Sequence, residues 1–228
     1  MEDVNAIHRI FKNLKYEMDN NGWVYQWHLG DEEPIKVTHK FYPPVSSEEF
    51  QLFEKHFPNM KLPASYKAFL SCSNGMELFC GEEGSSLVSC TIYSLKEALN
   101  QKEVWNNTPI LSDPEFTYHL PILFLQDIGD ITMDLQAVLE GREDYLCYPA
   151  PDTDRFNLPF NEWLERYIVC QGHEFWFFLN PYLPKYFLYI FISKYMFMKN
   201  TLTTNKLECF YNLYYIYRFT LSATHSGG

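Results

Sequence analysis

The chain is poor in basic residues. Its 228 residues include 18 Lys and Arg against 29 Asp and Glu, which gives a formal net charge of −11. Proteins that bind nucleic acid by neutralising phosphates depend on Lys and Arg, so this balance argues against a nucleic-acid partner. A basic protein surface is a better electrostatic partner. Because 46% of the residues are hydrophobic, the chain is not disordered, and its length suits one folded domain with an appendage.

Cysteine motifs for metal or redox chemistry are also missing. Six cysteines are present, but no two form a Cys-x-x-Cys pair, so neither a zinc ribbon nor a redox motif is present. The first residues lack the basic stretch and apolar core of a signal peptide. We therefore expect a cytoplasmic protein with reduced thiols, no metal and no cofactor.

Catalytic motifs are absent as well. The stretch that starts at His173-Glu174 resembles a zinc-protease helix, but Phe177 occupies the position of the second histidine. The Gly-Glu-Glu-Gly-Ser-Ser stretch at 81–86 lacks the lysine of a phosphate-binding loop, and no Gly-x-Ser-x-Gly elbow occurs. We expect a protein that is not an enzyme.

Asp127, Asp130 and Asp134 are the remaining candidates for a metal site. Strand alternation places Asp130 and Asp134 on one face, but the spacing matches no calcium-binding loop. An exposed hairpin turn explains Asp127 and Asp130 more simply.

The composition changes near residue 178. Residues 1–178 carry 13 basic and 28 acidic side chains, a net charge of −15, whereas residues 179–228 carry 5 basic and 1 acidic, a net charge of +4. The last 50 residues also contain 8 Tyr and 5 Phe. We therefore predict a folded domain over 1–178 and an atypical basic, aromatic C-terminal tail over 179–228.

Three interpretations of this tail remain open. Residues 186–198 are apolar enough for a membrane contact, but these 13 residues include a lysine, and a span needs about 20. The tail could instead pack its aromatic side chains on the domain. It could also be a frameshift or read-through product, because its commonest residues have A/T-rich codons.

Residue periodicity predicts an α+β domain, with a mostly antiparallel central sheet flanked by helices. Apolar residues at helical spacing predict helices over 4–18, 64–72 and 160–168, and Ser-x-x-Glu capping boxes start two others at residues 46 and 94. The helix from 94 is expected to end near residue 101, before a polar loop over 102–118. Strands are predicted over 22–29, 35–42, 76–79, 87–93, 120–125, 131–135 and 145–148.

An ordered set of short motifs resembles the signature of the SUKH superfamily, of the Smi/Knr type. A Phe-Glu pair is followed by Leu-Pro, then by Tyr-x-x-Phe-Leu and by Asn-Gly, and the helix over 160–168 resembles the family's closing helix. The resemblance covers about residues 40–178 and leaves a helix and hairpin over 1–42 in front of it. The matching residues, to which we assign structural roles, are Glu54, Leu62, Pro63, Tyr66, Phe69, Leu70, Asn74, Gly75 and Trp163.

This resemblance implies a SUKH-like α+β fold without catalytic residues. Bacterial members are commonly immunity proteins that bind and neutralise a toxin, often a nuclease or deaminase, whereas fungal relatives regulate the cell wall and signalling. We therefore expect a cytoplasmic immunity protein of a toxin–immunity pair, with a basic toxin domain as its partner. A regulatory adaptor of the cell-wall-signalling kind and a membrane-tethered binder remain alternatives.

Acidic side chains at predicted turns are the expected partner contacts. Complementary charge would speed encounter with a basic protein, although a solvated acidic surface also serves solubility. The candidate residues are Glu82, Glu83, Asp127, Asp130, Glu143 and Asp144.

Overall fold

The computed structural model describes residues 4–18, 20–26, 33–81, 88–109, 111–126, 128–148, 155–173 and 175–176. The chain divides into two compact units, Met1–Gly172 and His173–Gly228. The fold and the sites below belong to the first unit. The predictions for the tail over 179–228 lie outside the described residues.

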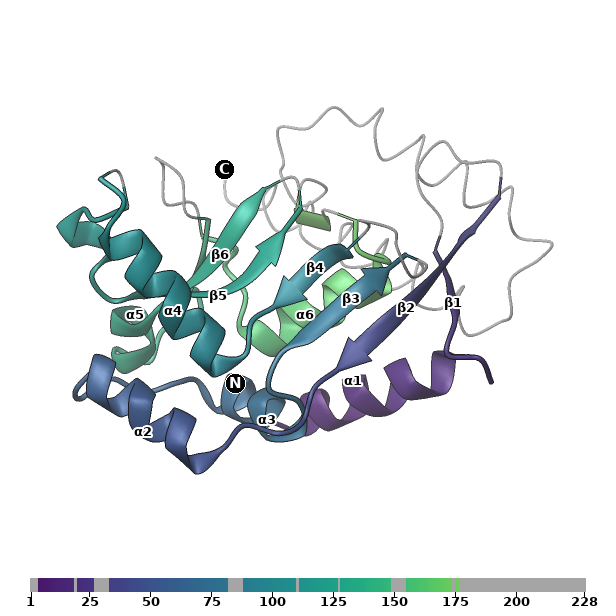
Figure 1. Ribbon diagram of the computed structural model, residues 1–228, viewed down its shortest axis with the longest axis horizontal. Helices are drawn as coiled ribbons and strands as arrows, with labels where there is room; N and C mark the ends of the chain where they lie inside the picture. The colour runs from purple at the N-terminus through teal and green to yellow at the C-terminus, as the bar shows by residue number, and fades with distance from the viewer. Residues whose placement is uncertain are drawn as a thin grey trace, which may run out of the picture. The chain divides into compact units, whose positions relative to one another are not determined.

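The centre of the first unit is one antiparallel sheet. Its seven strands follow the order of the chain, so each strand pairs with its neighbours in sequence (Figure 1). This arrangement confirms the predicted α+β class with an antiparallel sheet. The strands are β1 (Val24–Gln26), β2 (Ile35–Phe41), β3 (Met76–Cys80), β4 (Val88–Ile92), β5 (His119–Leu125), β6 (Gly129–Asp134) and β7 (Leu146–Cys147).

Helices cover both faces of the sheet. The described residues form α1 (Val4–Glu17), α2 (Ser47–His56), α3 (Ala64–Cys72), α4 (Leu95–Asn106), α5 (Leu135–Leu139), α6 (Phe160–Val169) and a 3-10 turn at Pro114–Phe116. Helices α1, α3 and α6 pack against one another, while α4 contacts β5 and α2. We call the sheet face covered by α6 the inner face and the face that contacts α4 the outer face (Figure 1).

The inner face of the sheet holds the hydrophobic core. Phe69 of α3 meets Phe11 of α1 and Phe160 of α6, with ring centroids 5.6 and 5.3 Å apart. Opposite these helices, alternate strand residues such as Leu78 and Ile131 are fully buried. Burial of aromatic side chains from three helices joins the N-terminal helix to the rest of the domain.

The residues of the motif set lie mainly in this core. Leu62 and Pro63 are buried just before α3, and the α3 side chains Tyr66, Phe69 and Leu70 are inaccessible to solvent, as is Trp163 of α6. Glu54 is the exception, because it lies exposed on α2.

Asn74 connects three elements by its hydrogen bonds. Its amide nitrogen donates to both carboxylate oxygens of Glu49 at 2.9 Å, and its amide oxygen accepts from the Leu95 backbone at 2.8 Å. Glu49 itself completes the capping box of α2 with Ser46. Although burial alone would raise it, these hydrogen bonds hold the pKa of Glu49 below its usual range. Asn74 therefore ties the first turn of α2 to the first turn of α4.

Gly75 allows the chain to pass close to the start of α4. Its φ angle is +98°, a conformation that side chains disfavour. A Cβ at this position would lie 2.9 Å from the Ser94 nitrogen and 3.1 Å from the Ile92 oxygen. The glycine of the Asn-Gly motif is therefore required by sterics as well as by backbone conformation.

Several predicted boundaries were wrong. Helix α4 continues to Asn106 instead of ending near residue 101, because Lys102 and Trp105 extend its buried stripe. The predicted loop over 102–118 accordingly starts later. Leu135 begins α5 instead of ending a strand, since Asp134 caps that helix through the amides of Gln136 and Ala137.

A bulge at Phe79 shifts the pairing of β2 with β3. Phe79 has a φ of +55°, and the register changes between Thr38 and Lys40. The Phe79 amide donates to Nδ1 of His39 at 3.2 Å, and the two rings meet edge to face at 4.9 Å. Burial lowers the pKa of His39 to about 4, so this histidine is a neutral acceptor in the folded protein.

Acidification is expected to destabilise the domain through His39. Its folded pKa lies below the ordinary value of 6.5, so the unfolded chain takes up the proton first. The contribution to stability is complete above pH 6.5 and decreases as the pH falls toward 4, by about 3 kcal/mol in total. Urea unfolding between pH 7 and pH 4 measures this slope. His39→Gln keeps an acceptor for the Phe79 amide and should reduce the dependence of the free energy of unfolding on pH. The same pH dependence in both proteins would contradict this role of His39.

Candidate functional site

A row of side chains crosses the outer face of the sheet. The strand registers pair Lys40 of β2 with Glu77 of β3, Glu77 with Thr91 of β4, Thr91 with Phe124 of β5, and Phe124 with Asp130 of β6. Directly paired residues point to the same face of an antiparallel sheet. We call these five residues the outer row.

The β2–β3 end of the outer row is a hydrogen-bonded polar cluster. Nζ of Lys40 lies 2.9 Å from Oε2 of Glu77, and the hydroxyl of Tyr42 donates to Oε1 of the same carboxylate. The hydrogen bonds from Lys40 and Tyr42 lower the pKa of Glu77, and the bond to Glu77 raises that of Tyr42 to about 12. At neutral pH the cluster therefore presents an ammonium, a carboxylate and a neutral phenol.

Aromatic side chains are accessible along the outer row. Phe124 is 39% exposed although β5 is a central strand, and Tyr42 is 43% exposed. Exposed aromatic rings beside fixed polar groups are typical of protein-binding surfaces, where Tyr, Phe and Trp are enriched. A sheet face of this kind suits the broad surface of a protein better than a small molecule.

The other end of the outer row is covered by α4. Asp130 accepts hydrogen bonds from the Tyr93 hydroxyl at 2.7 Å and from Gln101 Nε2 and Trp105 Nε1 at 2.8 Å each. Burial, together with the bond to Asp130, raises the pKa of Tyr93. Asp130 is 9% exposed, so the prediction that it lies in a solvated turn was wrong. The turn ends at Ile128, because Gly129 already belongs to β6.

Of the other predicted acidic contacts, the structure describes Glu143 and Asp144, which are not part of the outer row. Glu82, Glu83 and Asp127 lie outside the described residues. Glu143 and Asp144 lie between α5 and β7, where Arg142 donates to both carboxylate oxygens of Asp144 at 2.9 and 2.6 Å. This hydrogen bonding from Arg142 lowers the pKa of Asp144.

Asp134 has a structural role. Its Oδ1 caps α5, and its Oδ2 lies 2.6 Å from Nη2 of Arg155. Although burial alone would raise it, the hydrogen bonds from Arg155 and Ala137 hold the pKa of Asp134 below its usual range. Asp130 and Asp134 thus have different partners, and no group of three His, Cys, Asp or Glu in the described segments is arranged to hold a metal ion.

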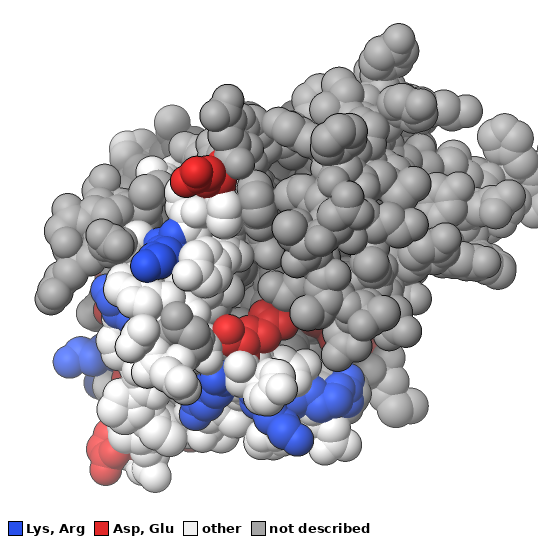
Figure 2. Space-filling model, turned by 90° about the vertical axis from the view of Figure 1, so that its right-hand side faces the viewer, with Lys and Arg blue, Asp and Glu red and all other residues white. Residues whose placement is uncertain are grey.

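The charge of the domain is unevenly distributed. On the side that carries α1 and β2, several blue basic side chains lie around a central red group, and two further red groups lie at the top and lower left of the view (Figure 2). The exposed basic residues of these two elements are Arg9, Lys12, Lys15, Lys36 and Lys40. This side therefore carries basic side chains alongside acidic ones, although the net charge of the chain is −11.

Strand alternation was the available signal for the outer row, because Lys40, Glu77 and Thr91 each interrupt apolar strand residues. The sequence did not show that these positions share a row, because the register depends on the bulge at Phe79.

Comparison with known proteins gives two similarities. A model described as the SMI1 / KNR4 family (SUKH-1) matches residues 44–179, which is more than half of the chain. An "Uncharacterized protein YobM" of Bacillus subtilis (strain 168) is 26% identical over 181 residues, which cover 75% of this chain and 91% of the relative. Among the helices that the structure describes, none has the length and apolar character that crossing a membrane requires.

Proposed function

Since the chain belongs to the SMI1/KNR4 (SUKH-1) family, as the motif resemblance predicted, we propose that it is a non-enzymatic immunity protein. It binds a cognate toxin domain directly in the cytoplasm and thereby neutralises it. The observation that carries this proposal is the outer row, in which the exposed side chains of Lys40 and Phe124 lie in line with Glu77.

The chemistry of the outer row supports protein binding. Glu77 is held in place by Lys40 and Tyr42, so its carboxylate is oriented before a partner arrives. Phe124 supplies apolar area, and preorganised polar groups reduce the entropy lost on association. A standard protein interface buries about 800 Å² on each partner, which extends well beyond one row of side chains.

The acidic loops would contribute mainly to the rate of association. Glu82, Glu83, Asp127, Glu143 and Asp144 remain our candidates for steering a basic toxin domain, since complementary charge accelerates encounter. Salt screens such steering, so the association rate should decrease between 50 and 500 mM salt while dissociation changes less.

The double substitution Tyr42→Ala with Phe124→Ala is expected to weaken toxin binding at least tenfold, because aromatic side chains dominate the energy of protein interfaces. Tyr118→Ala is the matched control: Tyr118 and Tyr42 are both 43% exposed, but Tyr42 bonds Glu77 of the outer row, whereas Tyr118 precedes β5. The toxin domain encoded beside this gene should be captured by the wild type and by Tyr118→Ala.

Growth rescue is the functional measurement. Co-expression of the wild type with the neighbouring toxin domain should restore growth, and the double variant should fail to do so at equal expression. Failure of both rescue and capture by the wild type would contradict the proposal. If the protein captures a signalling protein and does not restore growth in the presence of a toxin, the regulatory adaptor is favoured instead.

A further inference from the structure

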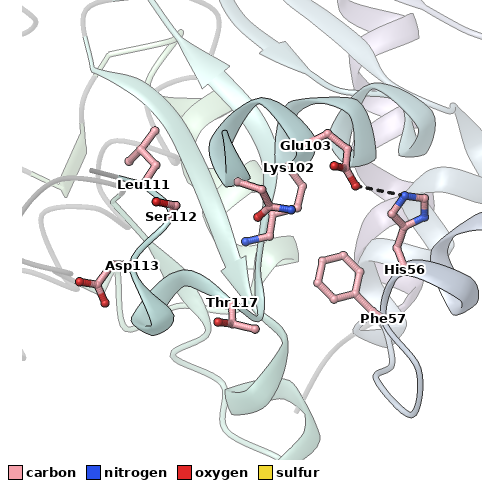
Figure 3. A pocket seen from close by; sticks show the side chains of 9 residues that line it. His56, Phe57, Lys102, Glu103, Leu111, Ser112, Asp113 and Thr117 are labelled. Carbon is pink, nitrogen blue, oxygen red and sulfur yellow. Dashed lines mark ion pairs between the residues drawn. The ribbon is translucent and has the colours of Figure 1, made fainter. Parts of the chain in front are cut away.

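A cavity of about 250 Å³ opens between α2, α4 and residues 111–117, away from the outer row (Figure 3). Its lining combines two apolar residues with charged, amide and hydroxyl groups. The lining residues are His56, Phe57, Lys102, Glu103, Asn106, Leu111, Ser112, Asp113 and Thr117.

Lys102 is the unusual group in this cavity. The residue is only 5% exposed, although lysines are rarely buried without a charged partner. Nζ donates to the carbonyl oxygen of Phe116 at 2.6 Å, which is its hydrogen-bond acceptor within the described residues. An ammonium has three N–H groups, so two remain for a molecule that enters the cavity. Burial lowers the pKa of Lys102, and the nearby charge of Glu103 opposes this shift only in part.

The two carboxylates of the lining do not compensate this charge by contact. Oε1 of Glu103 lies 3.5 Å from Nε2 of His56, and Oδ1 of Asp113 accepts from the Glu115 backbone at 3.0 Å. Figure 3 shows Glu103 directed toward His56, and Asp113 on the opposite side of the cavity. Both carboxylates are exposed at the rim, whereas the ammonium lies deeper.

We propose that this cavity is a binding site for a single carboxylate group, held by the ammonium of Lys102. A carboxylate supplies the charged acceptor that the buried ammonium lacks, in a bond of about 2.8 Å. Asn106 provides a second polar contact, while Phe57 and Leu111 provide apolar surface for the attached carbon atoms. The site is independent of the proposed function.

The rim favours a monoanion. Glu103 and Asp113 would repel a second negative charge, which disfavours phosphate as a dianion. The volume holds a short-chain acid or one acidic side chain, and it lies below the range of about 300–1,000 Å³ typical of drug-sized ligands.

The first test uses propionate, its neutral isostere propionamide and inorganic phosphate, with binding followed by NMR titration of the full-length protein. Propionate is expected to bind at least tenfold more tightly than either of the others, because only propionate pairs one charge with Lys102. Equal affinity for propionate and propionamide would overturn the proposal.

Three variants test whether Lys102 and the rim determine this binding. Lys102→Met removes the ammonium and leaves a side chain one atom shorter, so it should abolish propionate binding, whereas Lys96→Met, at an exposed position of α4, should bind as the wild type does. Glu103→Gln removes a rim charge from an exposed residue and should strengthen binding about twofold to fivefold. Should Lys102→Met fail to fold, unchanged or weaker affinity in Glu103→Gln would by itself contradict the site.

A peptide pair distinguishes the two possible sources of the carboxylate, a free small acid and an acidic side chain of another protein. Acetyl-Gly-Glu-Gly-amide and its glutamine analogue present the same chain with and without the acid. If the glutamate peptide binds more tightly than propionate, the site receives an acidic side chain of another protein; the reverse order indicates a free small acid. Equal binding of the two peptides would count against the proposal.

Discussion

Gly75→Ala is expected to reduce the free energy of unfolding by about 4 kcal/mol, because backbone strain and a steric clash act together. The φ of +98° disfavours any side chain, and the added Cβ would meet backbone atoms of Ser94 and Ile92 at 2.9 and 3.1 Å. These atoms belong to the end of β4 and the cap of α4, so neither can move without disturbing an element. Urea unfolding followed by tryptophan fluorescence measures the loss.

Gly129→Ala is the matched control for this prediction. Gly129 has nearly the same φ, +100°, but an added Cβ would meet no atom of the described residues within 4 Å. Its substitution should therefore cost only the conformational strain, about 1–2 kcal/mol. If the two variants lost equal stability, the close approach of Gly75 to α4 would have no energetic consequence.

Asp130→Ala is expected to cost about 4 kcal/mol, because three donors lose one charged acceptor. Trp105 is almost completely buried, so its indole N–H would be left without an acceptor and away from water. Gln101 and Tyr93 also lose their contacts with β6, and α4 loses its polar anchor on the outer face of the sheet. Urea unfolding followed by tryptophan fluorescence measures this loss of stability as well.

Two further variants test whether the loss depends on the charge of Asp130 and on its buried position. Asp130→Asn keeps one acceptor oxygen and should lose about half as much stability. Asp144→Ala removes another carboxylate of the same domain, but one whose ion pair with Arg142 lies at the surface, and should cost less than about 1 kcal/mol. A loss in Asp130→Ala no greater than that in Asp144→Ala would show that the buried acceptor is dispensable.

Local signals in the sequence were sufficient for much of the fold. The capping boxes at Ser46 and Ser94 both form as predicted, because each involves residues three positions apart. The Tyr-x-x-Phe-Leu helix and Trp163 are buried as their spacing and size indicated. The closing helix predicted from apolar spacing over 160–168 forms as α6.

Features that depend on distant partners were missed. Asp130 follows a Gly in a polar stretch and therefore resembles a turn residue, while its three donors lie 25–37 positions earlier in the chain. The buried position of Lys102 was missed for a similar reason. The sequence contains no sign that the carbonyl of Phe116 returns to α4, so Lys102 resembled the first residue of a polar loop.

The order of the strands has a consequence for how the domain folds. Since every strand pairs with its neighbours in sequence, each pairing of the sheet closes a hairpin or a connection that contains its own helix, and no crossover must wait for a distant strand. Short sequence separation between contacting segments is associated with fast folding, because less chain entropy is lost before contacts form. The sheet can therefore assemble progressively as the chain leaves the ribosome, with β1–β2 already paired before β7 is synthesised. Docking of α6 onto α1 and α3 then becomes the step that completes the core.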